Sequence, residues 1–236
     1  MPKSLSAVRE DPPCPVNPPL LLIDKPPGFT SHDVVNRVRR IFNTRHVGHA
    51  GTLDPFATGL LILGIDAGTK QLTALVGLDK TYEATLTLGA TSTTFDPEGV
   101  ITPTPALDHT PTREEVEEAL SSFRGGYLQR APIYSAKKLH GKKLYELARK
   151  GLATEEMRPE KQVIISRLAI TDYAWPTLSL IIDSSSGTYI RSLADDIGRA
   201  LGTGGYLTAL RRTRIGTYRI EEAKGLENLS TPHPSP

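Results

Sequence analysis

The segment from His49 to Gly59 carries the side chain best suited to chemistry, the carboxylate of Asp54. Gly51 permits a strained backbone or a close approach by another segment, and Pro55 forces Asp54 out of the helical region into an extended conformation. The carboxylate is therefore expected to point in a fixed direction. The same spacing also fits an ordinary turn in which the aspartate caps the backbone, and spacing alone does not separate the two interpretations.

Basic residues gather in three short segments, although the whole chain has a net charge of only +2 and a pI of about 8.6. Each cluster could meet the phosphates of a nucleic acid. A single cluster of this kind is more often a solvated surface, so the clusters alone decide nothing. They comprise Arg37, Arg39, Arg40, Arg45 and His46; Lys137, Lys138, His140, Lys142 and Lys143; and Arg211, Arg212 and Arg214.

The Asp54 loop must be positioned by the elements on either side of it. A short apolar strand is expected at residues 19–24, then a helix from 31 to about 42 with Ser31 as its N-cap. Arg37 and Arg40 lie three residues apart and therefore share one face of that helix. The helix's core stripe comprises Val34, Val38 and Ile41.

Strands and helices are mixed along the rest of the chain. From Lys80 onward apolar and polar residues alternate, which predicts a half-buried strand with Tyr82 on its apolar face. Further strands are expected at 60–65, 163–171 and 178–183, and helices after a capping box at Thr112 and Glu115, over 142–150, and after Gly187. Strict alternation is absent, so the predicted fold class is α+β.

One compact domain is expected over residues 19–228, with a surface excursion at about 91–150. The proline-rich compositions of 1–18 and 229–236 predict disordered tails. No apolar run approaches the ~18 residues that cross a membrane, and the N-terminus lacks the pattern of a secretory signal. These features favour a cytoplasmic protein.

The composition also limits the chemistry. Cys14 is the only cysteine, which excludes an intramolecular disulfide and a zinc site built on paired cysteines. The chain has neither a P-loop nor a dinucleotide fingerprint after a strand, because the glycines at 202–205 follow a helix and read as its C-cap and turn. We therefore expect no metal and no cofactor.

The segment from Gly48 to Gly59 resembles the catalytic loop of the TruB family of tRNA pseudouridine-55 synthases, whose motif is GHxGTLDPxAxG. Other segments follow in the family's order and cover about Leu20 to Ile220. They are DKPPG at 24–28 with Thr30 and Ser31, KTY at 80–82, YSAK at 134–137 with Gly141 and Tyr145, GTYIR at 187–191, and LRRTRIG at 210–216. The resemblance implies the pseudouridine synthase catalytic fold, with a mixed, mainly antiparallel central sheet flanked by helices and loops.

The implied reaction is the isomerisation of uridine-55 in the T-arm loop of tRNA. It breaks the bond between uracil N1 and ribose, turns the base over, and joins C5 to the same sugar carbon. Asp54 is the implied catalytic carboxylate, and whether it attacks the sugar or the base stays open. The expected partner is the T-arm stem-loop of tRNA, bound by a monomer that needs no protein partner and no membrane.

The resemblance also assigns roles to other residues. Arg191 is implied to keep Asp54 ionised. Its place in the first turn of a helix supports this role, because the helix macrodipole disfavours a cation there unless a nearby anion compensates its charge. Tyr82 is implied to stack on the target base and is suspected of proton transfer. His49 is implied to fill the gap left by the flipped nucleotide. Further expected substrate-site residues are Lys25, which supports the loop, Tyr189, which packs beside Asp54, and Leu210.

The basic clusters then become expected RNA contacts, through Arg37, Arg40, Arg45, Lys137, Lys142, Lys143, Arg211 and Arg212. The chain departs from the family pattern at Ala131, where many relatives have proline, and at Ser186, where many have lysine. It also ends soon after Ile220, so we expect no C-terminal RNA-binding domain of the PUA type.

Three alternatives remain at this point. A tRNA-folding chaperone without essential catalysis would share the basic clusters but would not explain Asp54 with Arg191. A guide-RNA-dependent modifier of ribosomal RNA, resembling the archaeal and eukaryotic branch, would share the catalytic loop, although that branch also carries the C-terminal domain. An unrelated hydrolase using Asp54 would release free uracil instead of forming pseudouridine.

Overall fold

The computed structural model describes residues 20–135, 138–139 and 141–229. The helices in this part are α1 (Ser31–Ile41), α2 (Leu72–Val76), α3 (Arg113–Ser121), α4 (Leu144–Arg149) and α5 (Ile190–Ala200), with short 3-10 helices η1 (Asp66–Gln71), η2 (Glu155–Met157), η3 (Ile220–Glu222) and η4 (Leu226–Asn228). The strands are β1 (Leu20–Lys25), β2 (Val47–His49), β3 (Thr58–Ile65), β4 (Lys80–Leu88), β5 (Ala90–Ser92), β6 (Ile101–Pro103), β7 (Gly125–Arg130), β8 (Lys138–Leu139), β9 (Lys142–Lys143), β10 (Glu160–Ala174), β11 (Thr177–Ser184), β12 (Gly205–Ile215), β13 (Tyr218–Arg219) and β14 (Lys224–Gly225).

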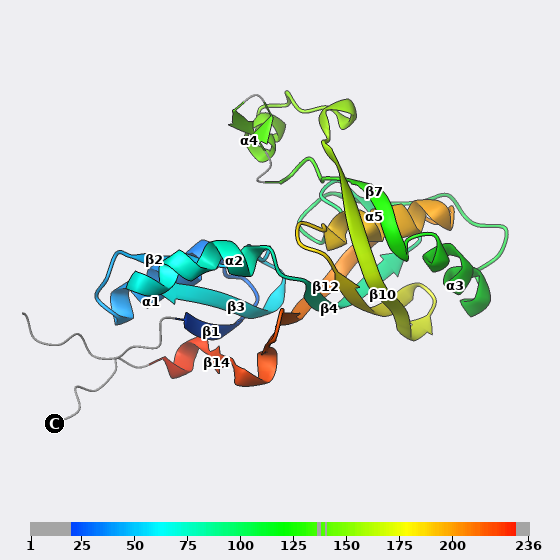
Figure 1. Cartoon of the computed structure of the whole chain (residues 1–236). Helices are drawn as coiled ribbons and strands as arrows, with labels where there is room; N and C mark the ends of the chain where they lie inside the picture. Colours follow the sequence, from blue (N-terminus) through cyan, green and yellow to red (C-terminus); the bar gives the residue numbers. More distant parts are fainter. Residues whose placement is uncertain (1–19, 136–137, 140, 230–236) are drawn as a thin grey trace, which may run out of the picture.

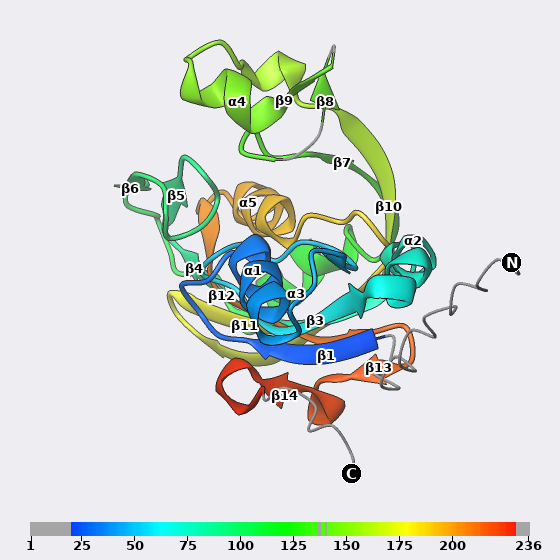
Figure 2. The ribbon, with the colours of Figure 1, turned by 90° about the vertical axis from the view of Figure 1, so that its left-hand side faces the viewer.

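A ten-stranded sheet runs through the described residues in the order β14-β1-β3-β12-β4-β11-β10-β7, with β13 beside β12 and β2 beside β3 (Figure 1). Its β1–β14 and β3–β12 pairs are parallel, and the other pairs are antiparallel. Figure 2 shows α1, α3 and α5 on one side of the sheet, and Figure 1 shows that α1 lies at the other end of the molecule from α3 and α5. The predicted α+β class with a mixed, mainly antiparallel sheet is confirmed.

Strand β3 is buried on both of its faces and therefore packs against helices on either side of the sheet. Its residues Leu61 and Leu63 pack with the valines of α1, while the alternating Leu60 and Ile62 pack with Leu75 of α2 on the opposite face. The larger core lies farther along the sheet, where α3 and α5 cover β4, β10, β11 and β12. The Asp54 loop enters β3 where these two parts meet.

The N-cap of α1 differs from the prediction. Thr30, not Ser31, caps the helix: its hydroxyl accepts from the Asp33 N–H, and the Asp33 carboxylate accepts from the Thr30 N–H at 2.9 Å. Ser31 is instead buried, where its hydroxyl donates to the Leu53 carbonyl at 3.1 Å and accepts from the Leu53 N–H at 2.9 Å. Ser31 thus fastens the start of the helix to the residue before Asp54.

The expected surface excursion at 91–150 is only partly a surface segment in the structure. The prediction is wrong for α3 and β7, because Val116 and Leu120 are fully buried in the main core and β7 forms an edge of the sheet. Strands β8 and β9 with α4 do stand away from the body of the sheet (Figures 1 and 2). The helix expected at 142–150 is shorter, since residues 142–143 form β9.

Most of the remaining expectations on elements agree with the structure. The strands expected at 163–171 and 178–183 are found as the longer β10 and β11, and the capping box of Thr112 with Glu115 starts α3. The expected tails, 1–18 and 229–236, lie outside the described residues except for Leu229.

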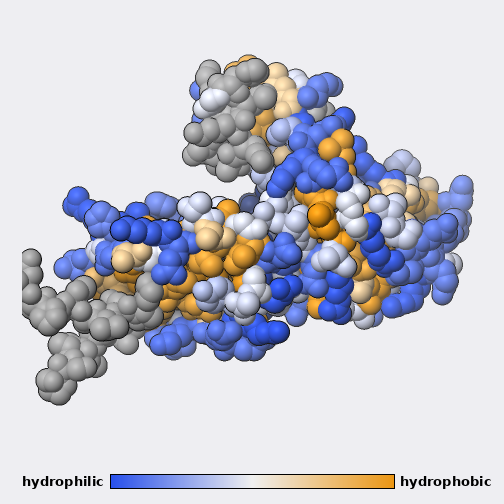
Figure 3. All heavy atoms as spheres, in the orientation of Figure 1, coloured by the Kyte–Doolittle hydropathy of each residue, from blue (hydrophilic) through white to orange (hydrophobic). Residues whose placement is uncertain are grey.

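No helix in the described ranges is long and apolar enough to cross a membrane. In Figure 3 apolar side chains show mainly along the middle of the molecule, with hydrophilic ones below and at the right-hand end.

Helix α5 is placed by a close backbone contact at its C-terminal end. A Cβ atom added at Gly198 would lie 2.2 Å from the backbone nitrogen of Gly205, where β12 begins. Only a residue without a side chain lets the helix and the strand approach so closely. Since α5 starts with Ile190 and Arg191, this contact at one end of the helix sets the position of the residues at its other end.

We expect Gly198→Ala to lower the free energy of unfolding by on the order of 1–3 kcal/mol, because backbone must move to admit the methyl group. Urea denaturation of both proteins measures the change. Gly77→Ala is the control, because Gly77 has a φ of −73° and its added Cβ would meet only ordinary contacts. Equal stability of the two variants would contradict the role assigned to Gly198.

Candidate active site

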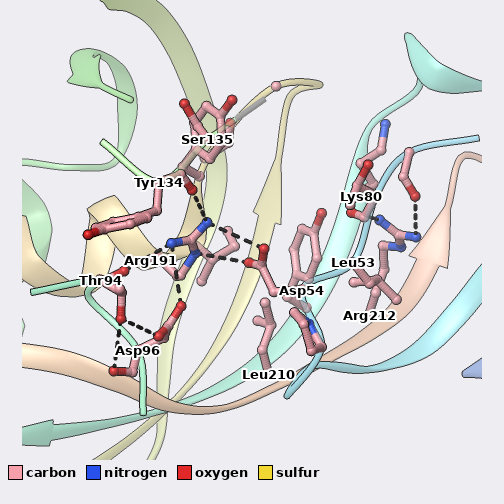
Figure 4. Close-up of a pocket in the computed structure, with 18 of the residues that line it drawn as sticks. Leu53, Asp54, Lys80, Thr94, Asp96, Tyr134, Ser135, Arg191, Leu210 and Arg212 are labelled. Atoms are coloured by element: carbon pink, nitrogen blue, oxygen red, sulfur yellow. Dashed lines mark hydrogen bonds and ion pairs between the residues drawn. The ribbon is translucent and has the colours of Figure 1, made fainter. Parts of the chain in front are cut away.

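A cavity of about 530 Å³ opens where the Asp54 loop meets β4, β12 and the start of α5 (Figure 4). Its walls include residues 51–55 of the loop, Tyr82 of β4, Leu210 and Arg212 of β12, and residues 187–191. The segments at 94–98 and 134–135 complete it from the other side. Residues far apart in sequence therefore converge on one site of the size that small-molecule pockets have, roughly 300–1,000 Å³.

Asp54 and Arg191 form a two-point ion pair at this cavity. The Arg191 Nε donates to Asp54 Oδ2 at 2.9 Å, and its Nη2 donates to Oδ1 at 3.3 Å. The Arg191 side chain is 7% exposed and the Asp54 side chain 33%, so the carboxylate still faces the cavity. Two backbone carbonyls, of Thr94 and Tyr134, accept from the other guanidinium N–H groups at 2.9 and 3.0 Å. The arginine is thus held on several sides while the carboxylate stays accessible.

A second carboxylate, Asp96, was missed by the sequence analysis. Its Oδ2 lies 3.4 Å from Arg191 Nη1, and its side chain is only 3% exposed. The Thr94 hydroxyl donates to its other oxygen. Asp96 precedes Pro97 just as Asp54 precedes Pro55, so the repeated Asp-Pro pair was the available signal. Arg191 therefore lies between two carboxylates, one facing the cavity and one buried.

Tyr82, Tyr189 and Leu210 line the cavity, as their expected substrate contact requires. Tyr82 and Leu210 are almost fully buried, which leaves only their cavity-facing surfaces available. Tyr189 is the N-cap residue of α5, and its backbone is fixed by Gln129, whose side chain accepts from the Tyr189 N–H and donates to its carbonyl. Burial raises the pKa of Tyr189, so this phenol stays protonated at neutral pH.

Lys25 and His49 do not line the cavity. Lys25 is fully buried behind the loop, where its Nζ donates to the carbonyls of Pro26, Phe29 and Pro55 at 3.0, 2.7 and 3.2 Å. This agrees with loop support and not with direct substrate contact. Burial lowers the pKa of Lys25 to about 8, against the opposing effect of the Asp54 charge. Burial also lowers the pKa of His49, at the end of β2, so its imidazole is neutral at physiological pH.

The expected RNA-contact residues fall into different environments. Arg37, Arg40 and Arg45 are exposed on α1 and the loop after it. Arg211 is partly exposed and makes a two-point pair with Asp24, at 3.1 and 2.7 Å. Lys137 lies outside the described residues, and Lys142 and Lys143 are placed only as the backbone of β9.

The structure contradicts the prediction that Arg212 contacts RNA. It is 1% exposed, so its guanidinium cannot reach a phosphate at the surface. Instead it donates to the carbonyls of Leu60 at 2.8 Å, Gly51 at 3.1 Å and Thr52 at 3.4 Å. The error came from reading a run of arginines as one surface, although neighbouring residues of a strand face opposite sides.

Lys80 is another residue of this wall that the sequence analysis did not assign. It lines the cavity, and its Nζ donates to the carbonyls of Val76, the last residue of α2, and of Leu78, two residues later. Burial lowers the pKa of Lys80 to about 8, and the nearby charge of Arg212 acts in the same direction. Within the described ranges no group of three or more histidine, cysteine, aspartate or glutamate side chains is arranged to hold a metal ion.

Comparison with known proteins connects this geometry to a family. A profile described as "TruB family pseudouridylate synthase (N terminal domain)" matches residues 39–190, and one described as "tRNA pseudouridylate synthase B C-terminal domain" matches residues 191–232. A protein of Corynebacterium diphtheriae named tRNA pseudouridine synthase B is 46% identical over 223 residues, which cover 92% of this chain and 74% of the relative. One of the same name from Mycobacterium sp. (strain KMS) is 47% identical over 216 residues, covering 89% and 71%.

Solved structures agree with the sequence relatives. A structure described as "Crystal Structure of a Cbf5-Nop10-Gar1 Complex" superposes with a TM-score of 0.69 and 28% identity, over 89% of this chain and 53% of that one. A second, "Structure of H/ACA RNP bound to a substrate RNA containing 2'-deoxyuridine", gives a TM-score of 0.66 and 26% identity, over 89% and 51%. The chain thus spans about half the length of these two proteins. Fold, cavity and sequence agree that the chain belongs to the TruB family of pseudouridylate synthases.

Proposed function

We propose that this protein isomerises uridine-55 in the T-arm loop of tRNA to pseudouridine, with Asp54 as the catalytic carboxylate. The observation that carries the proposal is the Asp54–Arg191 pair at the wall of a 530 Å³ cavity that Tyr82 also lines. The relatives named tRNA pseudouridine synthase B support the choice of tRNA as substrate. The protein acts alone, as a monomer without cofactor.

The ion pair suits the proposed chemistry because the reaction needs an ionised carboxylate beside the sugar. Arg191 favours the charged form of Asp54 by direct pairing, and its own position is fixed by Asp96 and two backbone carbonyls. Asp54 remains one-third exposed toward the cavity, so it can approach the anomeric carbon or the base of a bound nucleotide. Asp96 is a positioning residue in this scheme, because it acts through Arg191 and is itself buried.

The walls of the cavity suit an extruded base. A uridine stacked in an RNA loop is inaccessible, so the enzyme must take it out of the stack and replace the lost contacts. Tyr82 offers an aromatic surface for stacking, and Leu210 and Ile190 offer apolar contacts. Exposed arginines on α1 supply phosphate contacts near the loop that leads to Asp54.

Three alternatives predict different outcomes in the same reaction mixture. A hydrolase using Asp54 would release free uracil. A folding chaperone would bind tRNA without changing it. A guide-dependent enzyme would stay inactive without guide RNA and protein partners; one of the solved relatives is described as part of a Cbf5-Nop10-Gar1 complex, and the other as an H/ACA RNP bound to a substrate RNA. The decisive experiment incubates the purified chain alone with an unmodified tRNA transcript and maps pseudouridine along it. Conversion at position 55 supports the proposal; binding without conversion, free uracil, or a need for guide RNA would each overturn it.

Asp54→Asn should abolish pseudouridine formation while leaving tRNA affinity within about threefold of wild type, because it removes charge and nucleophilicity but keeps the shape. Single-turnover conversion and filter binding measure the two quantities separately. Conversion within a factor of ten of wild type would contradict the role of Asp54.

Arg191→Ala should lower kcat at least about a hundredfold, or roughly 2.7 kcal/mol, since Asp54 and Asp96 then lose the cation between them. Arg199→Ala is the matched control, because Arg199 lies on the same helix with a 64% exposed side chain that pairs with Asp195. The control should keep its activity. Full activity of the Arg191 variant would show that the pair is not needed for catalysis.

A further inference from the structure

Arg212 is a buried cation in the cavity wall, and the reaction proposed above gives it no role. Burial lowers its pKa. Within the described part of the chain no carboxylate forms an ion pair with it. An arginine buried without a carboxylate partner is costly, so its retention in the wall of a cavity calls for a specific use.

The groups that Arg212 holds are the backbone of the Asp54 loop. Its guanidinium donates to the carbonyls of Gly51 and Thr52, which precede Asp54 by three and two residues. These carbonyls belong to an irregular segment and would otherwise lack a buried donor. A third N–H fixes the carbonyl of Leu60, just beyond the loop. One side chain thus spans the loop from its beginning to its end.

Strand pairing places Arg212 beside Tyr82 and against the same loop. Arg212 is opposite Tyr82 in the β4–β12 pair and beside Gly59 in the β3–β12 pair. Gly59 has a φ of +100°, and a Cβ atom there would lie 2.3 Å from the Arg212 carbonyl oxygen. The end of the loop is therefore pressed directly against the Arg212 backbone. The Asp54 loop and Tyr82 have Arg212 as a common contact.

We propose that Arg212 is a positioning residue that holds Tyr82 and the Asp54 loop in one rigid unit. This deepens the proposed function and rests on it, because Tyr82 and Asp54 must keep a fixed relation to the same flipped base. Displacement of reacting groups by about 1 Å can cost a hundredfold in rate, so a shared anchor contributes to catalysis without touching the substrate. Arg212 acts through Tyr82 and the loop and makes no contact with RNA phosphates.

A double-mutant cycle tests this coupling. Single-turnover rate constants are measured for wild type, Arg212→Met, Tyr82→Phe and the double variant, with tRNA affinity and urea stability alongside. We expect Arg212→Met to lower the rate constant at least thirtyfold with tRNA affinity within threefold of wild type. In the Tyr82→Phe background the same change should cost at least tenfold less. Arg199→Met, a change at an exposed position, should leave the rate constant within threefold of wild type.

A spectroscopic signal tests the same contact without activity. With 3-fluorotyrosine at position 82, the ¹⁹F resonance should shift in Arg212→Lys, which keeps the charge but not the planar donor fork, and stay unchanged in Arg199→Met. Arg212→Lys also replaces Arg212→Met in the cycle if the latter does not fold. Additive effects in the cycle, an unshifted resonance, or weakened tRNA binding at an unchanged rate would each overturn the inference. Absence of pseudouridine formation by wild type would instead refute the proposed function, and the ¹⁹F result would still stand.

Discussion

The ion pair between Asp54 and Arg191 is the interaction on which the rest of the site depends. It joins the loop that leads into β3 with the first turn of α5. The loop packs in the same large core as α5, whereas β3 packs with α1 and α2. Each partner is anchored separately: Lys25, Ser31 and Arg212 hold the loop, while Asp96 and the Gly198 contact hold the arginine and its helix. The pair therefore forms at a fixed place, not wherever two flexible side chains meet.

Buried positive charge is the feature that unites the surroundings of the cavity. Lys25, Lys80, Arg191 and Arg212 are all buried and lie around or behind it. The nearby carboxylates are Asp54, Asp96 and the more exposed Glu98, whose pKa is raised by burial and by the other two carboxylates. Because cations inside a low-dielectric wall act at longer range than surface charges, this arrangement favours an anionic polymer such as RNA at the mouth of the cavity.

The sequence predicted this site where local rules apply and missed it where distant segments meet. Pro55 and Gly51 constrain the Asp54 backbone locally, and the macrodipole argument for Arg191 needs only its place in the helix. The resemblance to the family's motifs then separated the catalytic interpretation of both residues from the ordinary structural one. Asp96 and Arg191 are far apart in the sequence, so their pairing depends on the fold between them, and only the repeated Asp-Pro pair indicated it. Arg212 was misread because its inward orientation follows from the strand register, which the run of arginines hides.

We propose that the anchored Asp54–Arg191 pair makes pseudouridine in tRNA, and sequencing of cellular tRNA tests this role. Pseudouridine is mapped by sequencing tRNA from cells with the gene, without it, and with the gene restored. We expect position 55 alone to lose pseudouridine when the gene is deleted and to regain it when the gene is restored. Unchanged pseudouridine at position 55 in the deletion strain, with loss at another site or at none, would rule out this role of the pair.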